Sequence, residues 1–132
     1  MRNNKELSGL LSELLCQPED DFPFVVVEEH ASGKFVQFGG SATRPLFLDL
    51  PWQTLSEIEF YRAVAYFQRM GVAGAEEEML DAPGGKVVGT EFTFQMSFRT
   101  VDAAVVVASA VFEEVYQFPS DKELSIKASW LD

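Results

Sequence analysis

The sequence is poor in cysteine, histidine and basic residues. Cys16 is the only cysteine, so no disulfide can form within the chain, and we expect a reducing, cytoplasmic compartment. His30 is the only histidine, so any catalytic triad that needs histidine must include it. Ten basic residues against 21 acidic ones leave a net charge of −11, which opposes binding to nucleic-acid phosphates.

The sequence also lacks a long apolar run. The longest charge-free apolar candidate, residues 103–112, is about half of what a bilayer span requires. Glu6 and Glu13 interrupt the apolar stretch near the N-terminus, so a signal peptide and a membrane association are not expected. With 132 residues, 47% of them apolar, the composition predicts a single globular domain over residues 1–132.

The first third of the chain predicts one helix followed by three strands. Residues 5–16 place leucines at helical spacing, and the valine run within 22–29 favours a strand. A second strand is expected over 35–38, with turns at 31–33 and at Gly39 and Gly40, and a third over 46–50 that Pro51 ends. The short connections predict an antiparallel meander.

After Pro51 the apolar period changes from 2 to 3.6, which predicts a second helix. Either Thr54 with Glu57 or Ser56 with Glu59 has the spacing of a capping box, and Gly71 is suited to the helix end. Residues 76–82 are interpreted as a strand, followed by a turn at 83–85. Residues 91–99 alternate, with one apolar face made of Phe92, Phe94, Met96 and Phe98.

The third predicted helix begins at Thr100 as N-cap and runs to about residue 117. Val107 and its neighbours make its second side apolar too, so this helix must be covered on two sides, by its own domain or by another subunit. Residues 123–130 alternate like a last edge strand. The expected class is α+β, an antiparallel sheet of about five strands with three helices in the order α-β-β-β-α-β-β-α, with a C-terminal strand as an option.

This order of elements resembles the type III secretion chaperone-like fold, and within it the TY-Chap and YbjN-like bacterial proteins. The residues that carry the resemblance are 34–38, 48–51, the helix over 61–71, and Val115 with Tyr116. The resemblance implies a small, acidic, often homodimeric domain that binds other polypeptides without nucleotide hydrolysis. The long tail after the third helix departs from the family pattern.

Four features could suggest chemistry, and each has a plainer interpretation. His30 beside Glu28 and Glu29 lies before a hairpin turn, where a solvated residue is expected and the spacing of a zinc site is missing. The glycines and lysine at 84–86 lack the full phosphate-loop pattern and indicate a turn. The acidic run 76–78 is typical of a solvated surface, although it could bind a basic partner. Cys16 is expected to be a packing residue.

Aromatic residues are abundant: the chain has 12 Phe, three Tyr and two Trp. Trp52, Phe118 and Trp130 lie at loop or edge positions, where they either cap the core or dock a partner, since aromatic residues anchor interfaces. For a dimer, the candidate surface is the second side of the third helix, made of Val107, Ala110 and Val111.

We therefore expect a non-enzymatic binding module, chaperone-like or regulatory, that acts as a homodimer. It would hold another polypeptide by an apolar surface ringed with acidic residues. No catalytic, cofactor-binding or metal-binding residue is predicted, and no nucleic-acid or membrane partner. Two alternatives stay open at this point: a small-ligand-binding or enzymatic domain with a pocket between sheet and helices, and a purely structural assembly protein.

Overall fold

The computed structural model describes residues 1, 3–72, 74–80 and 85–131, with the backbone alone at 75–80 and 89–91. Its three α-helices are α1 (Asn4–Leu14), α2 (Glu57–Arg69) and α3 (Val101–Ala110). Its six strands are β1 (Phe24–Glu28), β2 (Phe35–Ser41), β3 (Arg44–Pro51), β4 (Gly74–Leu80), β5 (Val87–Phe98) and β6 (Ser125–Ala128). Short helical turns are η1 (Glu19–Asp21), η2 (Trp52–Thr54) and η3 (Val111–Val115).

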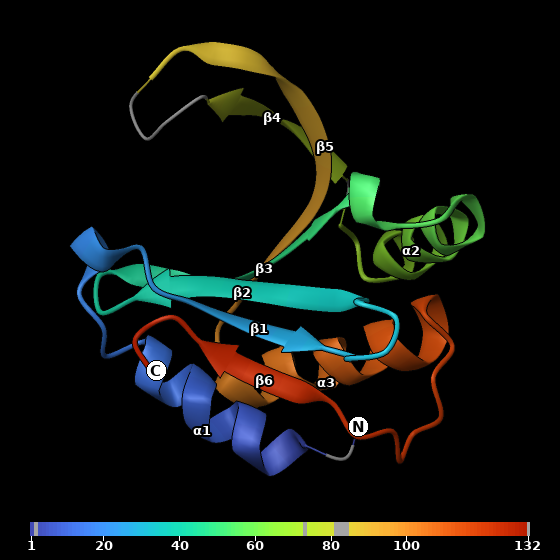
Figure 1. The fold of residues 1–132 in the computed structure, drawn as a ribbon, viewed down its shortest axis with the longest axis horizontal. Helices are drawn as coiled ribbons and strands as arrows, with labels where there is room; N and C mark the ends of the chain where they lie inside the picture. Colours follow the sequence, from blue (N-terminus) through green and yellow to red (C-terminus); the bar gives the residue numbers. More distant parts are fainter. Residues whose placement is uncertain (2, 73, 81–84, 132) are drawn as a thin grey trace.

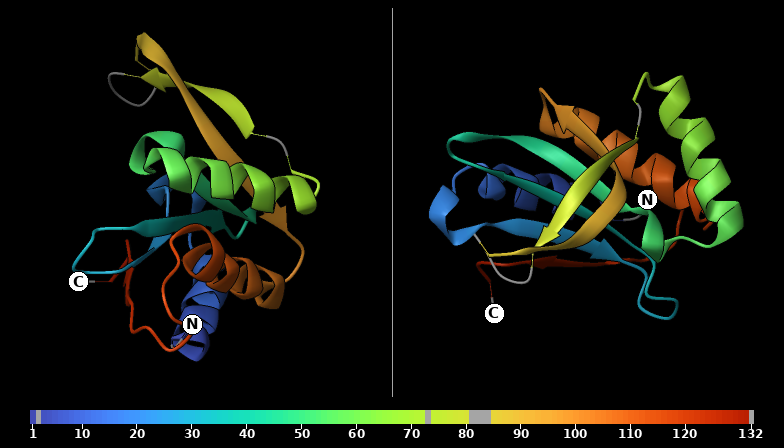
Figure 2. Two further views of the ribbon diagram at one scale, coloured as in Figure 1. Left: turned by 90° about the vertical axis from the view of Figure 1, so that its right-hand side faces the viewer. Right: turned by 90° about the horizontal axis from the view of Figure 1, so that it is seen from above.

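The strands form one antiparallel sheet in the order β4-β5-β3-β2-β1-β6. The α+β class, with its antiparallel sheet and three helices, is therefore confirmed. Figure 1 shows α1 and α3 beneath β1, β2 and β6, while β4 and β5 curl away on the other side. Seen from above in Figure 2, the β4–β5 hairpin crosses over β2 and β3, as expected of a strongly twisted sheet.

The meander of β1, β2 and β3 has the predicted order, but its second turn does not lie at the predicted position. Gly39 and Gly40 lie within β2, which continues to Ser41. The phenyl ring of Phe47 on β3 covers Gly39 so closely that a side chain there would collide with it. The ladder is irregular between Gly39 and Ser41, and Gly40 has a φ of 147°, so glycine here serves the sheet and not a turn.

The start of α2 settles which predicted capping box forms. Ser56 is the N-cap: its hydroxyl accepts a hydrogen bond from the Glu59 amide, and the Glu59 carboxylate accepts one from the Ser56 amide. Gly71 follows the helix with a φ of 76°, as predicted. The opposite sides of α2 differ: Ala63, Tyr66 and Phe67 are buried, whereas Tyr61 and Ile58 are exposed.

The β4–β5 hairpin is longer than the sequence pattern suggested. β5 spans Val87–Phe98, and it pairs with β3 through residues 93–98 and with β4 through most of its length. The predicted strand 76–82 corresponds to β4, Gly74–Leu80. Residues 81–84, which include most of the predicted turn, lie outside the described residues. β4 and β6 are the two edges of the sheet, and β6 confirms the expected C-terminal strand.

The third helix begins as predicted, because the Thr100 hydroxyl accepts a hydrogen bond from the Ala103 amide. It does not stay α-helical to residue 117: after Ala110 it continues as η3, a turn of π-helix in which the Tyr116 amide donates to the Val111 carbonyl. This wider turn orients Tyr116, whose hydroxyl donates to the Phe35 carbonyl at 2.6 Å. The last helix is thereby tied to the start of β2.

A contiguous core lies between the sheet and the helices. It contains Leu7, Leu11 and Leu14 from α1, alternate residues of β1, β2 and β3, and both apolar sides of α3. The two-sided apolar helix is therefore covered within its own chain, by the sheet on one side and by α1 on the other (Figure 1). A second subunit is not needed to cover it.

Candidate functional site

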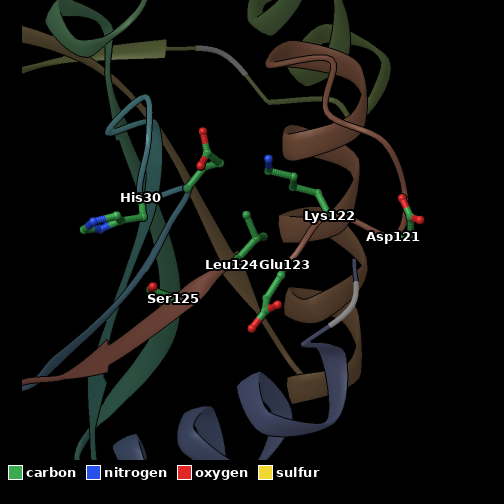
Figure 3. Close-up of a pocket in the computed structure, with 7 residues that line it drawn as sticks. His30, Asp121, Lys122, Glu123, Leu124 and Ser125 are labelled. Atoms are coloured by element: carbon green, nitrogen blue, oxygen red, sulfur yellow. The ribbon is translucent and has the colours of Figure 1, made fainter.

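The hollow beside His30 has a polar lining and a volume of about 530 Å³. Its lining includes His30, Asp121, Lys122 and Glu123. Figure 3 shows the imidazole of His30 pointing away from the side chain of Lys122, and the residue is exposed, as the sequence predicted. An exposed imidazole with no convergent partner is not placed for general base catalysis.

Glu29, which lines the same hollow, serves the turn that follows β1. Its carboxylate accepts hydrogen bonds from the amides of Ala31 (2.9 Å) and Ser32 (3.1 Å). The Ala31 hydrogen bond is the main reason why the pKa of Glu29 is lowered; burial opposes the shift, and Ser32 and Lys122 support it. Within the described residues, no group of three His, Cys, Asp or Glu side chains is arranged to hold a metal ion.

Three other features singled out in the sequence have different outcomes. Cys16 is exposed, and its thiol lies 3.6 Å from the Ser12 carbonyl oxygen. The prediction that Cys16 is a packing residue is therefore wrong. Of the candidate turn 84–86, the structure describes Gly85 and Lys86, which are exposed before β5. The acidic run 76–78 lies in β4, where Glu76 is paired with Phe92 and Glu77 with Glu91 in the sheet register.

The dimer surface predicted on α3 is wrong for two of its three residues. Val107 is 2% exposed and Val111 is fully buried, because both pack in the core of their own chain. Ala110 is half-buried against the same core. The sequence pattern showed correctly that a second covering layer was needed, but it could not show that α1, about 100 residues away along the chain, provides that layer.

The aromatic candidates divide into two groups. Phe118 and Trp130 are half-buried and pack against the core, and Phe118 also contacts the rings of Phe112 and Tyr116. Trp52 is 45% exposed, in η2 directly before α2. Of the three, Trp52 is the residue that projects into a surface hollow with apolar character.

The aromatic hollow, as we call it, has a volume of about 510 Å³ and a mainly apolar lining. It lies where η2 and the first turn of α2 meet β5. Its lining residues are Trp52, Leu55, Ser56, Glu57, Phe60, Tyr61 and Phe92.

Three rings of the aromatic hollow stand at a steep angle to the ring of Phe60. Phe60 is central: its ring centroid lies 6.2 Å from Trp52, 6.1 Å from Tyr61 and 6.0 Å from Phe92, with interplanar angles of 70°, 63° and 68°. Edge-to-face contacts at these distances are favourable, and they hold the rings at fixed angles. Tyr61 remains 62% exposed, so the hollow presents aromatic surface to solvent.

A second hollow continues from the first along α2. Its volume is about 370 Å³, and it shares Phe92 with the aromatic hollow. Its other lining residues are Val64, Gln68, Gly71, Val72, Gly74 and Phe94. We call the two hollows together the α2 groove. Glu57, Tyr61, Val64 and Gln68 follow one another at helical spacing along its wall, over about 16 Å at 1.5 Å per residue.

The α2 groove is held in place by polar contacts at the start of α2. Lys34, from the β1–β2 turn, donates a hydrogen bond of 2.7 Å to the Glu59 carboxylate, and both side chains are largely buried. Burial raises the pKa of Glu59, but the hydrogen bonds from Lys34 and Ser56 and the nearby ammonium outweigh it, so the pKa is lowered overall. Glu59 therefore stays ionised at neutral pH and fixes the helix that carries the groove.

Trp52 was predicted from the sequence as a partner-binding candidate, but the residues around it in the aromatic hollow were not. Phe92 was assigned to the apolar face of residues 91–99, and Phe60 was not among the candidate partner-binding residues; both are only half-buried. A signal was present: Tyr61 and Ile58 lie off the apolar stripe of α2, so this helix has large apolar side chains on its outer surface too. The pairing of β5 with both β3 and β4, which brings Phe92 to the hollow, has no local signature.

Within the described residues, none of the helices is both long enough and apolar enough to cross a lipid bilayer. Comparison of the chain with known protein families, with curated proteins and with solved structures found no match.

Proposed function

We propose that this protein is a non-enzymatic, cytoplasmic binding module that holds an apolar and basic segment of another polypeptide in the α2 groove. The observation that carries the proposal is the exposure of Trp52 and Tyr61 in one apolar hollow built of four aromatic rings. Aromatic side chains of this kind dominate the binding energy of protein interfaces. The resemblance to type III secretion chaperone-like proteins agrees with this role.

The size of the α2 groove fits a peptide segment. A length of about 16 Å accommodates roughly five residues of an extended chain at 3.3 Å per residue. Two hollows that share Phe92 supply separate places for two side chains of the segment.

The charge of the protein indicates the kind of segment. Glu57 lines the aromatic hollow and is exposed. With a net charge of −11, the molecule attracts basic chains and repels acidic ones.

Two soluble 12-residue peptides test the proposal. One combines lysine, leucine, phenylalanine and serine, and the other replaces every lysine with glutamate. In a Trp130→Phe background, Trp52 is the sole tryptophan and its fluorescence reports binding. We expect the basic peptide to bind with a micromolar Kd that weakens as salt is added, and the acidic peptide not to bind.

Matched variants locate the binding surface. Trp52→Ala and Tyr61→Ala, followed by calorimetry, should each weaken the basic peptide about five-fold or more. Ile58→Ala is the control, since Ile58 is 59% exposed on the same helix but does not line the groove. Binding that is absent, or equally insensitive to all three substitutions, would refute the proposed function.

The expected homodimer is a second part of the proposal. Since Val107 and Val111 are buried, another surface must carry it, and Phe24 and Leu131 are exposed beside the edge strand β6. Light scattering behind a sizing column tests it: a dimer is expected, and a monomer at micromolar concentration would remove this part alone.

A further inference from the structure

We infer that the aromatic hollow is a receptor for a single cationic side chain, a lysine or arginine of the bound polypeptide. This inference rests on the proposed function and specifies the chemistry of its anchor. The general proposal requires only that the α2 groove hold an apolar and basic segment. The inference adds that the positive charge itself enters the hollow.

Three other aromatic rings of this protein each have a cation of the chain over them. Arg44 lies over Phe47 with its guanidinium carbon 4.7 Å from the ring centroid, Arg69 lies 5.6 Å from that of Tyr66, and the Lys122 ammonium 5.8 Å from that of Phe118. Each of these rings attracts a cation of the chain, as the negative face of an aromatic ring does.

In the aromatic hollow this partner is missing. Among the cations that the structure describes, none lies over Trp52, Phe60, Tyr61 or Phe92. Besides its aromatic and apolar residues, the lining contains one serine and one carboxylate. Trp52 and Tyr61 offer the most accessible rings, and tryptophan binds cations more strongly than the other aromatic residues.

Glu57 also favours a cation in the aromatic hollow. It lies four residues before Tyr61, so the two side chains are neighbours on the surface of α2. Glu57 is exposed, whereas Glu59, two residues further on, is engaged by Lys34 and Ser56. A carboxylate beside several aromatic rings favours a cation over a neutral or anionic group.

The perpendicular arrangement of the rings supports the same occupant. The rings of Trp52, Tyr61 and Phe92 make interplanar angles of 63° to 70° with the ring of Phe60, so these rings do not form a flat stack. A flat aromatic ligand would favour parallel rings. A lysine ammonium with its methylene stem is better suited to a hollow lined by angled aromatic rings and by the carboxylate of Glu57.

The test compares peptides that differ in one atom group. In the basic 12-residue peptide, each lysine in turn is replaced by norleucine, which keeps the methylene stem and removes the ammonium. Binding is measured by calorimetry at 150 mM salt. One replacement is expected to weaken binding about five-fold or more, and the others much less, because a cation–π contact adds to ordinary screened attraction.

Substitutions of residues that line the aromatic hollow show whether that lysine binds there. Trp52→Leu and Tyr61→Leu keep apolar bulk but remove the ring, and Glu57→Gln removes the charge. Each is expected to abolish most of the difference between the lysine and norleucine peptides, while binding of the norleucine peptide itself changes little. Ile58→Leu serves as the control on the same helix and should leave the difference unchanged.

The outcomes separate this inference from the proposed function. If the peptide binds, Trp52→Ala weakens it, and no lysine-to-norleucine replacement differs from the others, the cation receptor is refuted and the peptide groove stands. If the same lysine-to-norleucine replacement still weakens binding to the Trp52→Leu, Tyr61→Leu and Glu57→Gln variants, the cation binds elsewhere and the inference fails. If neither peptide binds, both proposals fail together.

Discussion

The phenyl ring of Phe92 lies directly over the backbone of Gly74, in the space that a side chain at position 74 would occupy. The two residues belong to neighbouring strands: Gly74 of β4 is paired with Phe94 of β5, and Phe92 lies two residues from Phe94 on the same strand. Phe92 is the residue that the two hollows of the α2 groove share. The absence of a side chain at Gly74 therefore decides where the central wall of the groove stands.

Gly74→Ala should displace the Phe92 ring towards the groove. The fold should survive, because the colliding atoms are the outer end of a side chain that can rotate. We expect a loss of about 1 to 2 kcal/mol in the free energy of unfolding and weaker binding of the basic peptide. Urea denaturation and calorimetry measure the two effects.

The double variant Gly74→Ala with Phe92→Leu is the control for that displacement. It removes the ring that collides, so adding Gly74→Ala to Phe92→Leu should cost no stability compared with Phe92→Leu alone. A Gly74→Ala variant as stable and as active in binding as the unmodified chain would show that Phe92 does not depend on Gly74.

Gly9→Ala should stabilise the protein. Gly9 is exposed in the middle of α1, and a side chain there meets no atom within 4 Å. Alanine in a helix is favoured over glycine by about 0.5 to 1 kcal/mol. Thermal and urea denaturation should both show the gain, and a loss of stability would mean that the glycine has a role which the structure does not reveal.

Val107→Glu should unfold the protein instead of separating two subunits. Val107 is 2% exposed within its own chain, so a carboxylate there is buried without a partner. The expected loss is at least about 4 kcal/mol, large for one substitution. The neighbouring Val106→Glu is the matched control, since Val106 is 66% exposed on the same helix and should change stability by no more than about 0.5 kcal/mol. A folded Val107→Glu variant that has only lost association would restore the dimer surface on α3.

Glu59→Gln should reduce stability at neutral pH but not in acid. The pKa of Glu59 is lowered in the folded protein, so its ionised form contributes stability above its unfolded pKa, near 4.5, and this contribution is lost as the pH falls through the folded pKa. We expect the variant to be about 1 to 2 kcal/mol less stable at pH 7, with the difference shrinking below pH 4. Urea denaturation across this range checks the prediction; a constant difference would exclude the charge as its cause.

Local features of the fold could be predicted because each has a local physical cause. Residue spacing predicted the helix at 5–16 and the strand before Arg99. Capping groups predicted the start of the helix after Ser56 and the N-cap at Thr100. Gly39 and Gly40 misled the prediction because a glycine is equally suited to a turn and to a strand position that another ring covers. The π-helical turn after Ala110 was also not predicted, because the sequence there keeps α-helical spacing.

The sequence by itself determined the α+β class, the antiparallel meander, the need to cover α3 on two sides and the acidic charge of the molecule. Only the tertiary structure decided that α1 covers α3, and that η2, α2 and β5 bring Trp52, Phe60, Tyr61 and Phe92 around one hollow. The reason is physical: periodicity and capping depend on residues within a few positions of one another, whereas a surface hollow depends on contacts between strands and helices distant along the chain. Those contacts are selected by the packing of the whole core, and no single segment specifies them.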